Sequence, residues 1–183
     1  MNRRIIFVCD EQELEKVLSR AKQDPCPHCG RIGTLNRHDR LTGNAPNQHS
    51  GHSVRGKRLW CSNRGARGGC GRTTSLLFAW VLPRHTFTAP LLSSLLGKVA
   101  AGSSVKAAWE GLDTLLALES AYSLMRRFRE RIDFLRSMLF SHAKPPRSAT
   151  VDPVVQTIEH LQRSFPDNAV SAFQTTFAHP IMG

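Results

Sequence analysis

Four cysteines constrain the fold of this chain more strongly than any other feature of its sequence. Cys26 and Cys29 are separated by two residues, and Cys61 and Cys70 are separated by eight residues, of which three are glycine. A gap of two residues lets one turn present two thiolates to one metal ion, and four thiolates arranged tetrahedrally make a closed structural zinc site. The spacing therefore predicts a structural zinc ion held by Cys26, Cys29, Cys61 and Cys70.

The residues beside the cysteines favour this site. Pro27 restricts the first turn, because its ring fixes φ near −65°. Gly30 and Gly71 each follow a cysteine directly and can adopt a positive φ, which turns backbone N–H groups toward the thiolates. Arg31 and Arg72 place positive charge beside a site whose formal charge, with four thiolates and one zinc ion, is about −2.

Other interpretations of the cysteines stay open. They could be buried free thiols or could form a disulfide, although nothing in the sequence indicates the oxidising compartment in which disulfides persist. His49 and His52 are reserve ligands in case Cys61 or Cys70 does not bind. His28 is expected to point outward from the first turn.

The positive charge of the chain is clustered in two stretches. The net charge is +11, and residues 26–72 hold nine basic residues and one acidic residue, while residues 121–147 hold seven basic and two acidic residues. Clustering of this kind is typical of a protein that binds a polyanion. The alternative is a basic surface that is simply solvated.

The N-terminal half is predicted to combine two small parts. Residues 1–25 read as a βα lead-in, with a strand from Arg4 to Cys9 and a helix capped by Asp10. Residues 26–75 are expected to form a small zinc ribbon, with short paired strands around the cysteines. The glycine-rich and polar residues 41–56 are expected to form a mobile loop at its tip.

The C-terminal half is predicted to be helical, so that the fold class is α+β and mostly helical. Residues 73–87 would lead into a helical domain over residues 88–142. A C-terminal helix capped by Asp152 would follow within residues 150–183, with a loosely docked tail. The helical domain would hold a helix capped by Thr88, a short helix capped by a serine, and one long basic helix over residues 118–140.

Three helices in this order, of which the second is short and the third is basic, are the layout of a helix-turn-helix. An ordinary three-helix bundle is the alternative, and a dimerising coiled coil through the helix 118–140 is a further one. In the helix-turn-helix interpretation the third helix enters the major groove of DNA. Its N-terminal side chains would face base edges and its later arginines would face phosphates.

The predicted DNA contacts come from both basic stretches. In the cysteine segment they are Arg31, Arg37, Arg40, Arg55, Lys57, Arg58, Arg64, Arg67 and Arg72. In the third helix they are Ser120, Tyr122, Ser123, Arg126, Arg127, Arg129 and Arg131.

The motifs together resemble a known family. Cys-Pro-x-Cys-Gly, then Trp60-Cys61, then Cys70-Gly-Arg-Thr73 and a helix-turn-helix are similar to the N-terminal part of bacterial insertion-sequence transposases. Ser120-Ala-Tyr122-Ser-Leu-Met-Arg126-Arg-Phe128-Arg129 resembles their recognition helix. The eight-residue gap departs from the family, where the gap is usually two residues. Those enzymes continue into a catalytic domain with a metal-binding Asp-Asp-Glu triad, whereas here 31 residues follow Asp152.

The resemblance implies the DNA-binding half of such a protein without its recombinase half. We therefore expect a zinc-dependent protein that binds double-stranded DNA, as a regulator or as an accessory factor of a mobile element. The alternative is a zinc ribbon that binds RNA or a protein. An enzyme is not expected, because four cysteine ligands leave a zinc ion no open position. The apolar runs are too short for a signal peptide or a membrane span, so we expect a cytoplasmic, nucleoid-associated protein.

Overall fold

The computed structural model describes residues 4–65 and 68–182 and divides the chain into two compact units. The first unit comprises residues 1–43 and 52–79, and the second unit comprises residues 44–51 and 80–183. The chain therefore passes from one unit to the other three times. The predicted lead-in and zinc-ribbon segments fall almost entirely in the first unit, while the segments 88–142 and 150–183 fall in the second.

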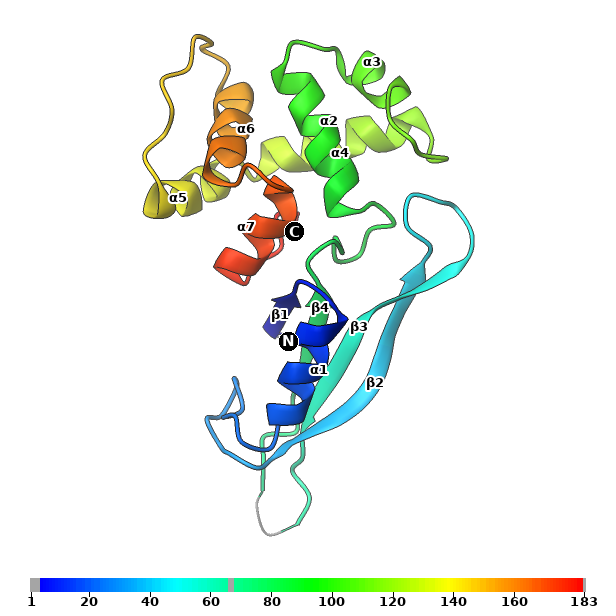
Figure 1. Ribbon diagram of the computed structural model, residues 1–183, viewed down its shortest axis with the longest axis vertical. Coiled ribbons are helices and arrows are strands. Elements are labelled where there is room, and N and C mark those ends of the chain that lie inside the picture. Colours follow the sequence, from blue (N-terminus) through cyan, green and yellow to red (C-terminus); the bar gives the residue numbers. More distant parts are fainter. Residues whose placement is uncertain (1–3, 66–67, 183) are drawn as a thin grey trace. The chain divides into compact units, whose positions relative to one another are not determined.

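The first unit is a four-stranded sheet with one helix against it (Figure 1). The strands lie in the order β1-β4-β3-β2, with β1 parallel to β4 and β3 antiparallel to it. Their bounds are Arg4–Val8 for β1, Leu35–Asn44 for β2, His52–Cys61 for β3 and Thr73–Phe78 for β4. The fold class is α+β, as predicted.

Helix α1 (Glu11–Arg20) follows β1 and begins at the predicted cap. The Asp10 carboxylate accepts a hydrogen bond from the Glu13 amide at 2.8 Å, and the Glu13 carboxylate accepts one from the Cys9 amide at 2.6 Å. Leu14 and Leu18 are buried on one side of the helix. Both the strand and the helix of the predicted lead-in are confirmed.

The expectation of a loop over residues 41–56 is wrong for both ends of that range, and only residues 45–51 lie outside the strands as a tip. Strand β2 continues to Asn44 and β3 begins at His52, so the two form a long hairpin. Glycine is tolerated here for a specific reason: at Gly56 the φ angle is +150°, and β3 passes so close to the Leu76 carbonyl that a Cβ atom would collide with it. Gly56, whose residue type is typical of loops, therefore permits close strand pairing.

Residues 73–87 also differ from the expectation that they only lead into the helices. Their first part is β4, which lies between β1 and β3 in the sheet. Thr74, Leu76 and Leu77 of this strand are at most 8% exposed. The first part of the apolar run is thus one of the two inner strands of the sheet.

The second unit, as far as the structure describes it, contains six helices and one core. The helices are α2 (Ala89–Ala100), α3 (Val105–Glu110), α4 (Leu118–Glu130), α5 (Ile132–His142), α6 (Pro153–Ser164) and α7 (Ala169–Phe177). The predicted caps are confirmed, since Thr88, Ser104 and Asp152 each accept a backbone hydrogen bond from the first turn of α2, α3 and α6 respectively. Leucine and phenylalanine side chains from these helices form one continuous core.

The prediction of one long helix over residues 118–140 is wrong. Arg131, with φ −110° and ψ 5°, separates α4 from α5. The coiled-coil alternative depends on Met125, Phe128, Ile132, Leu135 and Leu139. Four of them are at most 1% exposed in the core of the same chain, and Ile132 is partly buried against that core. The break lets both short helices bury their apolar sides in one core.

The expectation of a loosely docked tail is also wrong. Residues 169–177 form α7, in which Val170 and Phe173 are fully buried. Ile181 and Met182, close to the C-terminus, are fully buried as well. The tail therefore completes the core of the second unit.

The hairpin tip, residues 44–51, belongs to the second unit and is fixed there by Asn47. The Asn47 amide donates to the Thr86 carbonyl at 3.0 Å, and the Asn47 carbonyl accepts from the Leu115 amide at 3.2 Å. The Thr88 hydroxyl donates to the Asn47 side chain at 3.2 Å. Asn47 adopts a positive φ of 56°, which asparagine tolerates better than most residues.

None of the helices in the described part of the chain is long and apolar enough to cross a membrane.

Candidate metal centre

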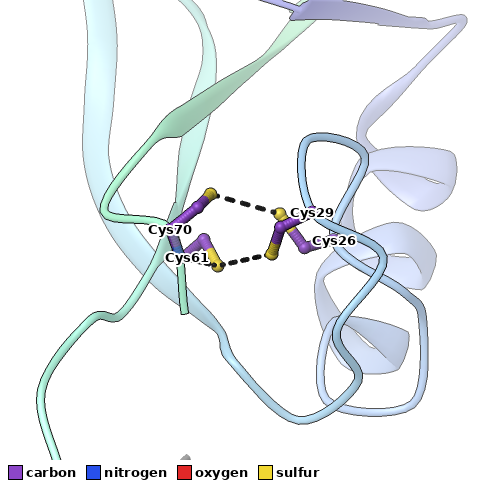
Figure 2. Close-up of side chains that lie close together, drawn as sticks. All are labelled: Cys26, Cys29, Cys61 and Cys70. Carbon is purple, nitrogen blue, oxygen red and sulfur yellow. Dashed lines mark hydrogen bonds between the residues drawn. The ribbon is translucent and has the colours of Figure 1, made fainter. Parts of the chain in front are cut away.

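The four predicted cysteine ligands come together at one point of the first unit, as Figure 2 shows. The Sγ atoms of Cys26 and Cys70 are 3.9 Å apart, those of Cys29 and Cys61 are 3.8 Å apart, and all four lie within 4.8 Å of one another. A tetrahedral ion with metal–sulfur bonds of about 2.3 Å requires sulfur–sulfur distances of about 3.8 Å. The four thiols are thus arranged to bind one metal ion. They are too far apart for any disulfide.

The first cysteine turn is closed by backbone hydrogen bonds. The Gly30 amide donates to the Cys26 carbonyl at 2.8 Å, and the Cys26 amide donates to the Arg31 carbonyl at 2.9 Å. The His28 amide points at Cys26 Sγ at 3.4 Å. Gly30 has a φ of 72°, as the sequence predicts, and this left-handed residue reverses the chain after Cys29.

The second cysteine turn repeats this pattern despite its longer gap. The Gly71 amide donates to the Cys61 carbonyl at 2.9 Å, and the Cys61 amide donates to the Arg72 carbonyl at 2.9 Å. The Cys70 amide points at Cys61 Sγ at 3.2 Å, and Gly71 has a φ of 70°. The eight-residue segment is therefore an insertion into a turn of the same kind as the first.

The inserted loop leaves and returns through Ser62 and Gly69. The Gly69 amide donates to the Ser62 carbonyl at 2.6 Å, which brings the two ends of the insertion together. A Cβ atom on Gly69 would collide with the Ser62 carbonyl and lie 2.5 Å from Cys61 Sγ. Glycine at this position makes room for the ligand sulfur, so the residues present fit a bound metal ion.

Replacing Gly69 with alanine is expected to weaken metal binding about 10- to 100-fold, the usual effect of disturbing the residues that orient metal ligands. Competition with a chromophoric chelator measures this affinity. Gly65→Ala is the control within the same loop, because a Cβ atom on Gly65 meets no atom within 4 Å. Any effect of this control comes from the positive φ of Gly65, 76°, a conformation that Gly69 does not adopt. Equal affinities for the two variants would contradict the role assigned to Gly69.

The protonation of the cysteines depends on their surroundings. Burial raises the pKa of Cys26 to about 12 and also raises the pKa of Cys70. Burial alone would raise the pKa of Cys61 too, but hydrogen bonds with Thr34, the Cys70 amide and the neighbouring thiols lower it to about 7. Since metal ligation requires thiolates, a bound cation would supply the charge that lets Cys26 and Cys70 ionise despite their raised pKa values.

The histidines near the cysteines are not part of the cluster. His28 Nε2 lies 3.1 Å from the Thr73 carbonyl, so the expectation that His28 points outward is wrong, and the ring ties the first turn to β4. His49 and His52 are both exposed, and the metal-binding group formed by the described residues contains neither of them. The reserve ligands are therefore not needed.

Several basic residues of the first unit are held by partners. Lys57 Nζ lies 2.5 Å from a Glu15 carboxylate oxygen, and Arg37 forms a 3.5 Å ion pair with the same glutamate. The Arg55 side chain lies against Gly43, and burial lowers the pKa of Arg55. These three side chains are engaged within the hairpin and with α1, so less of their charge faces an external ligand.

Other predicted contacts of this unit are more accessible. Arg31, Arg40, Arg64 and Arg72 are exposed, and Arg58 is partly exposed. Arg67 lies outside the described residues. The accessible cations thus come from β2, β3 and the loops around the cysteines.

The predicted contacts on α4 share one side of the helix, with one exception beyond its end. Tyr122, Arg126 and Arg129 are exposed, while Ser120, Ser123 and Arg127 are partly exposed. Arg131 is different: its guanidinium packs over the Phe134 ring at 4.5 Å and donates to the Pro180 carbonyl at 3.4 Å. Arg131 therefore holds the C-terminal residues in place.

Sequence reasoning missed Thr34 and Gly69 as parts of the site. Thr34 is buried, its Oγ1 lies 3.2 Å from Cys61 Sγ, and its carbonyl accepts from the Ser62 amide at 2.8 Å. The only available signal was the position of Gly69 immediately before a cysteine. Comparison with protein-family models, curated proteins and solved structures finds no match for this chain.

Proposed function

We propose that this protein is a zinc-stabilised nucleic-acid-binding protein that binds double-stranded DNA, as a regulator or a mobile-element accessory factor. The observation that carries the proposal is the surface of α4. Its apolar side, with Ala121, Leu124 and Phe128, is buried, and its other side presents Tyr122 and two arginines to solvent. A rigidly packed helix with a cationic outer face suits groove binding.

The packing of the neighbouring helices supports a helix-turn-helix role for α4. Helix α3 contacts both α2 and α4. The Trp109 indole donates to the Leu116 carbonyl at 3.1 Å, which fixes the turn between α3 and α4. In this proposal Ser120, Tyr122, Ser123 and Arg126 face base edges, and Arg127 and Arg129 face phosphates. Arg131 is left out because its guanidinium contacts Phe134 and Pro180.

Zinc is the metal that we propose for the four cysteines. Four thiolates in tetrahedral arrangement select zinc or iron among the common metals. A sulfide-bridged iron cluster would spread the cysteine sulfurs over several irons, whereas here all four lie within 4.8 Å of one another. A closed set of four ligands is structural rather than catalytic, so we propose no reaction at this metal centre.

The test is selection of bound sequences from random duplex DNA by the zinc-loaded protein, followed by affinity measurements over a range of salt concentrations. An enriched motif and a steep fall of affinity with salt are expected, because phosphate contacts release counterions. An affinity that does not change with salt, or the absence of any binding, would refute the proposal. The metal content of the same sample, measured by mass spectrometry, distinguishes zinc from iron.

Replacing Arg126 with alanine is expected to reduce discrimination between the selected motif and unrelated duplex by about 1–3 kcal/mol, because in this proposal the side chain reads a base. Arg126 makes only an exposed 3.8 Å ion pair with Glu130, so its loss should leave stability nearly unchanged. Arg163→Ala is the control, since Arg163 is exposed on α6. Binding curves on both duplexes provide the measurement. Equal discrimination by the Arg126 and Arg163 variants would contradict the proposal that α4 lies in the groove.

A further inference from the structure

The sheet of the first unit has two different faces. Lys57 on β3 forms an ion pair with Glu15 of α1, so the face that holds Lys57 is the one that α1 covers. Arg58 and Trp60 alternate with Lys57 along β3 and therefore lie on the opposite face. Their partners on β4 are Ser75 and Thr73 respectively. Arg58, Trp60 and both β4 residues are all partly exposed, so this second face is open to a ligand.

An aromatic ring with cationic neighbours stands on this open face. The Arg64 guanidinium lies 5.8 Å from the centre of the Trp60 ring. The His38 ring meets Trp60 edge to face, with 6.3 Å between the ring centres, and a 2.8 Å contact with the Asp39 carboxylate orients it. Tryptophan is the side chain that offers the largest flat surface for stacking.

The charge around Trp60 defines the ligand further. Arg40 lies two residues after His38 on β2 and is exposed, so it belongs to the same face as the histidine. Arg58 lies two residues before Trp60 on β3. The only acidic residue of the segment 26–72 is Asp39, and it is already paired with His38. The face thus combines a flat apolar surface with positive charge, and a nucleotide combines a flat base with negative charge.

We infer that Trp60, His38 and Arg64 hold an unpaired nucleobase of a single strand, while Arg58 and Arg40 contact its flanking phosphates. Stacking of bases on aromatic side chains beside a cationic groove is how proteins hold single strands. This inference rests on the proposed nucleic-acid binding and adds a second mode to it, in which the first unit takes unpaired strands and α4 takes duplex. Unpaired DNA and unpaired RNA share the chemistry.

The test measures binding of the metal-loaded protein to oligo(dT), oligo(rU) and a duplex of equal length. Trp60→Ala is expected to weaken single-strand binding about 5- to 150-fold, the fold-change that corresponds to the measured worth of one stacked base. Trp60→Phe should keep most of the affinity, and duplex binding should stay unchanged in both variants. Loss of duplex and single-strand binding by the same factor would overturn the inference.

Fluorescence provides a second readout that does not depend on the alanine variant folding. The chain has three tryptophans. Oligo(dT) or oligo(rU) should quench the emission of the wild-type protein, and this quenching should disappear in Trp60→Phe. Equal quenching by poly-glutamate would show that the face binds any polyanion. Quenching that persists in Trp60→Phe would show that the base binds near another tryptophan. Either result overturns the inference.

The same experiment separates this inference from the proposed function. If the wild-type protein binds no nucleic acid, the proposed function fails. If it binds duplex but no single strand, or if Trp60→Ala binds single strands as wild type does, the inference fails alone. The ratio of affinities for oligo(dT) and oligo(rU) shows whether the face prefers DNA or RNA. A metal content equal to that of the wild type shows that the metal centre at Cys61 is folded in each variant.

Discussion

Replacing Cys61 with serine is expected to release the bound metal ion and unfold the first unit. Cys61 is fully buried, ends β3, and supplies both a ligand sulfur and the carbonyl that closes the second cysteine turn. Binding of structural zinc contributes about 10 kcal/mol or more to folding, which is comparable to the whole stability of a small domain. Metal content per chain and circular dichroism during heating measure the loss.

The second unit is expected to stay folded in the same variant, because its core draws on the helices α2 to α7. The chain offers a matched control in Cys9, a fifth cysteine that is exposed and lies outside the cluster. Cys9→Ser should retain one metal ion and the wild-type unfolding temperature. An unchanged melting curve for Cys61→Ser would show that the cysteine cluster does not stabilise the first unit.

Replacing Gly56 with alanine is expected to destabilise the first unit by about 2 to 6 kcal/mol. Two unfavourable contributions add. A φ of +150° is nearly restricted to glycine, and the new Cβ would collide with the backbone carbonyl of Leu76 on β4. Strained backbone of this kind and overpacking each cost about 1–3 kcal/mol. Chemical denaturation of the metal-loaded protein, followed by hydrogen exchange of β3 and β4 amides, measures the change.

Gly43→Ala is the matched control on the neighbouring strand. A Cβ atom on Gly43 would meet the end of the Arg55 side chain at 2.5 Å, but a flexible side chain can move away where a backbone carbonyl cannot. The control should therefore lose less than about 1 kcal/mol, as surface substitutions usually do. If both alanine variants are equally stable, β3 does not approach β4 as closely at Gly56 as described.

The metal centre and the helix starts could be predicted because they depend on short-range patterns. A thiolate pair needs only the spacing of Cys26 and Cys29, and a cap such as Asp10 or Thr88 acts on the next turn of chain. The similarity of the two cysteine turns was not predictable, since the loop from Ser62 to Gly69 gives the second pair a different spacing in the sequence. It depends on hydrogen bonds that form only when both ends of the loop meet.

The long hairpin, the break between α4 and α5 and the end of the chain were misjudged because they depend on tertiary packing. Gly56 resembles a loop signal, yet it serves close strand pairing that only the presence of β4 explains. Leu118 to Leu139 shows an unbroken helical repeat, but one core is better filled by two helices that meet at Arg131. Met182 carries no helical pattern and is nevertheless fully buried, because other elements cover it.

The hairpin tip has a consequence for how this protein can be divided. A cut after Ala79 would separate the helices from residues 44–51, which belong to the same unit. The helical fragment would lose Asn47 and its bonds to Thr86 and Leu115. The two halves, produced as separate chains, would behave as the parts of a split protein, in which the loop 44–51 of one fragment completes the helical unit of the other.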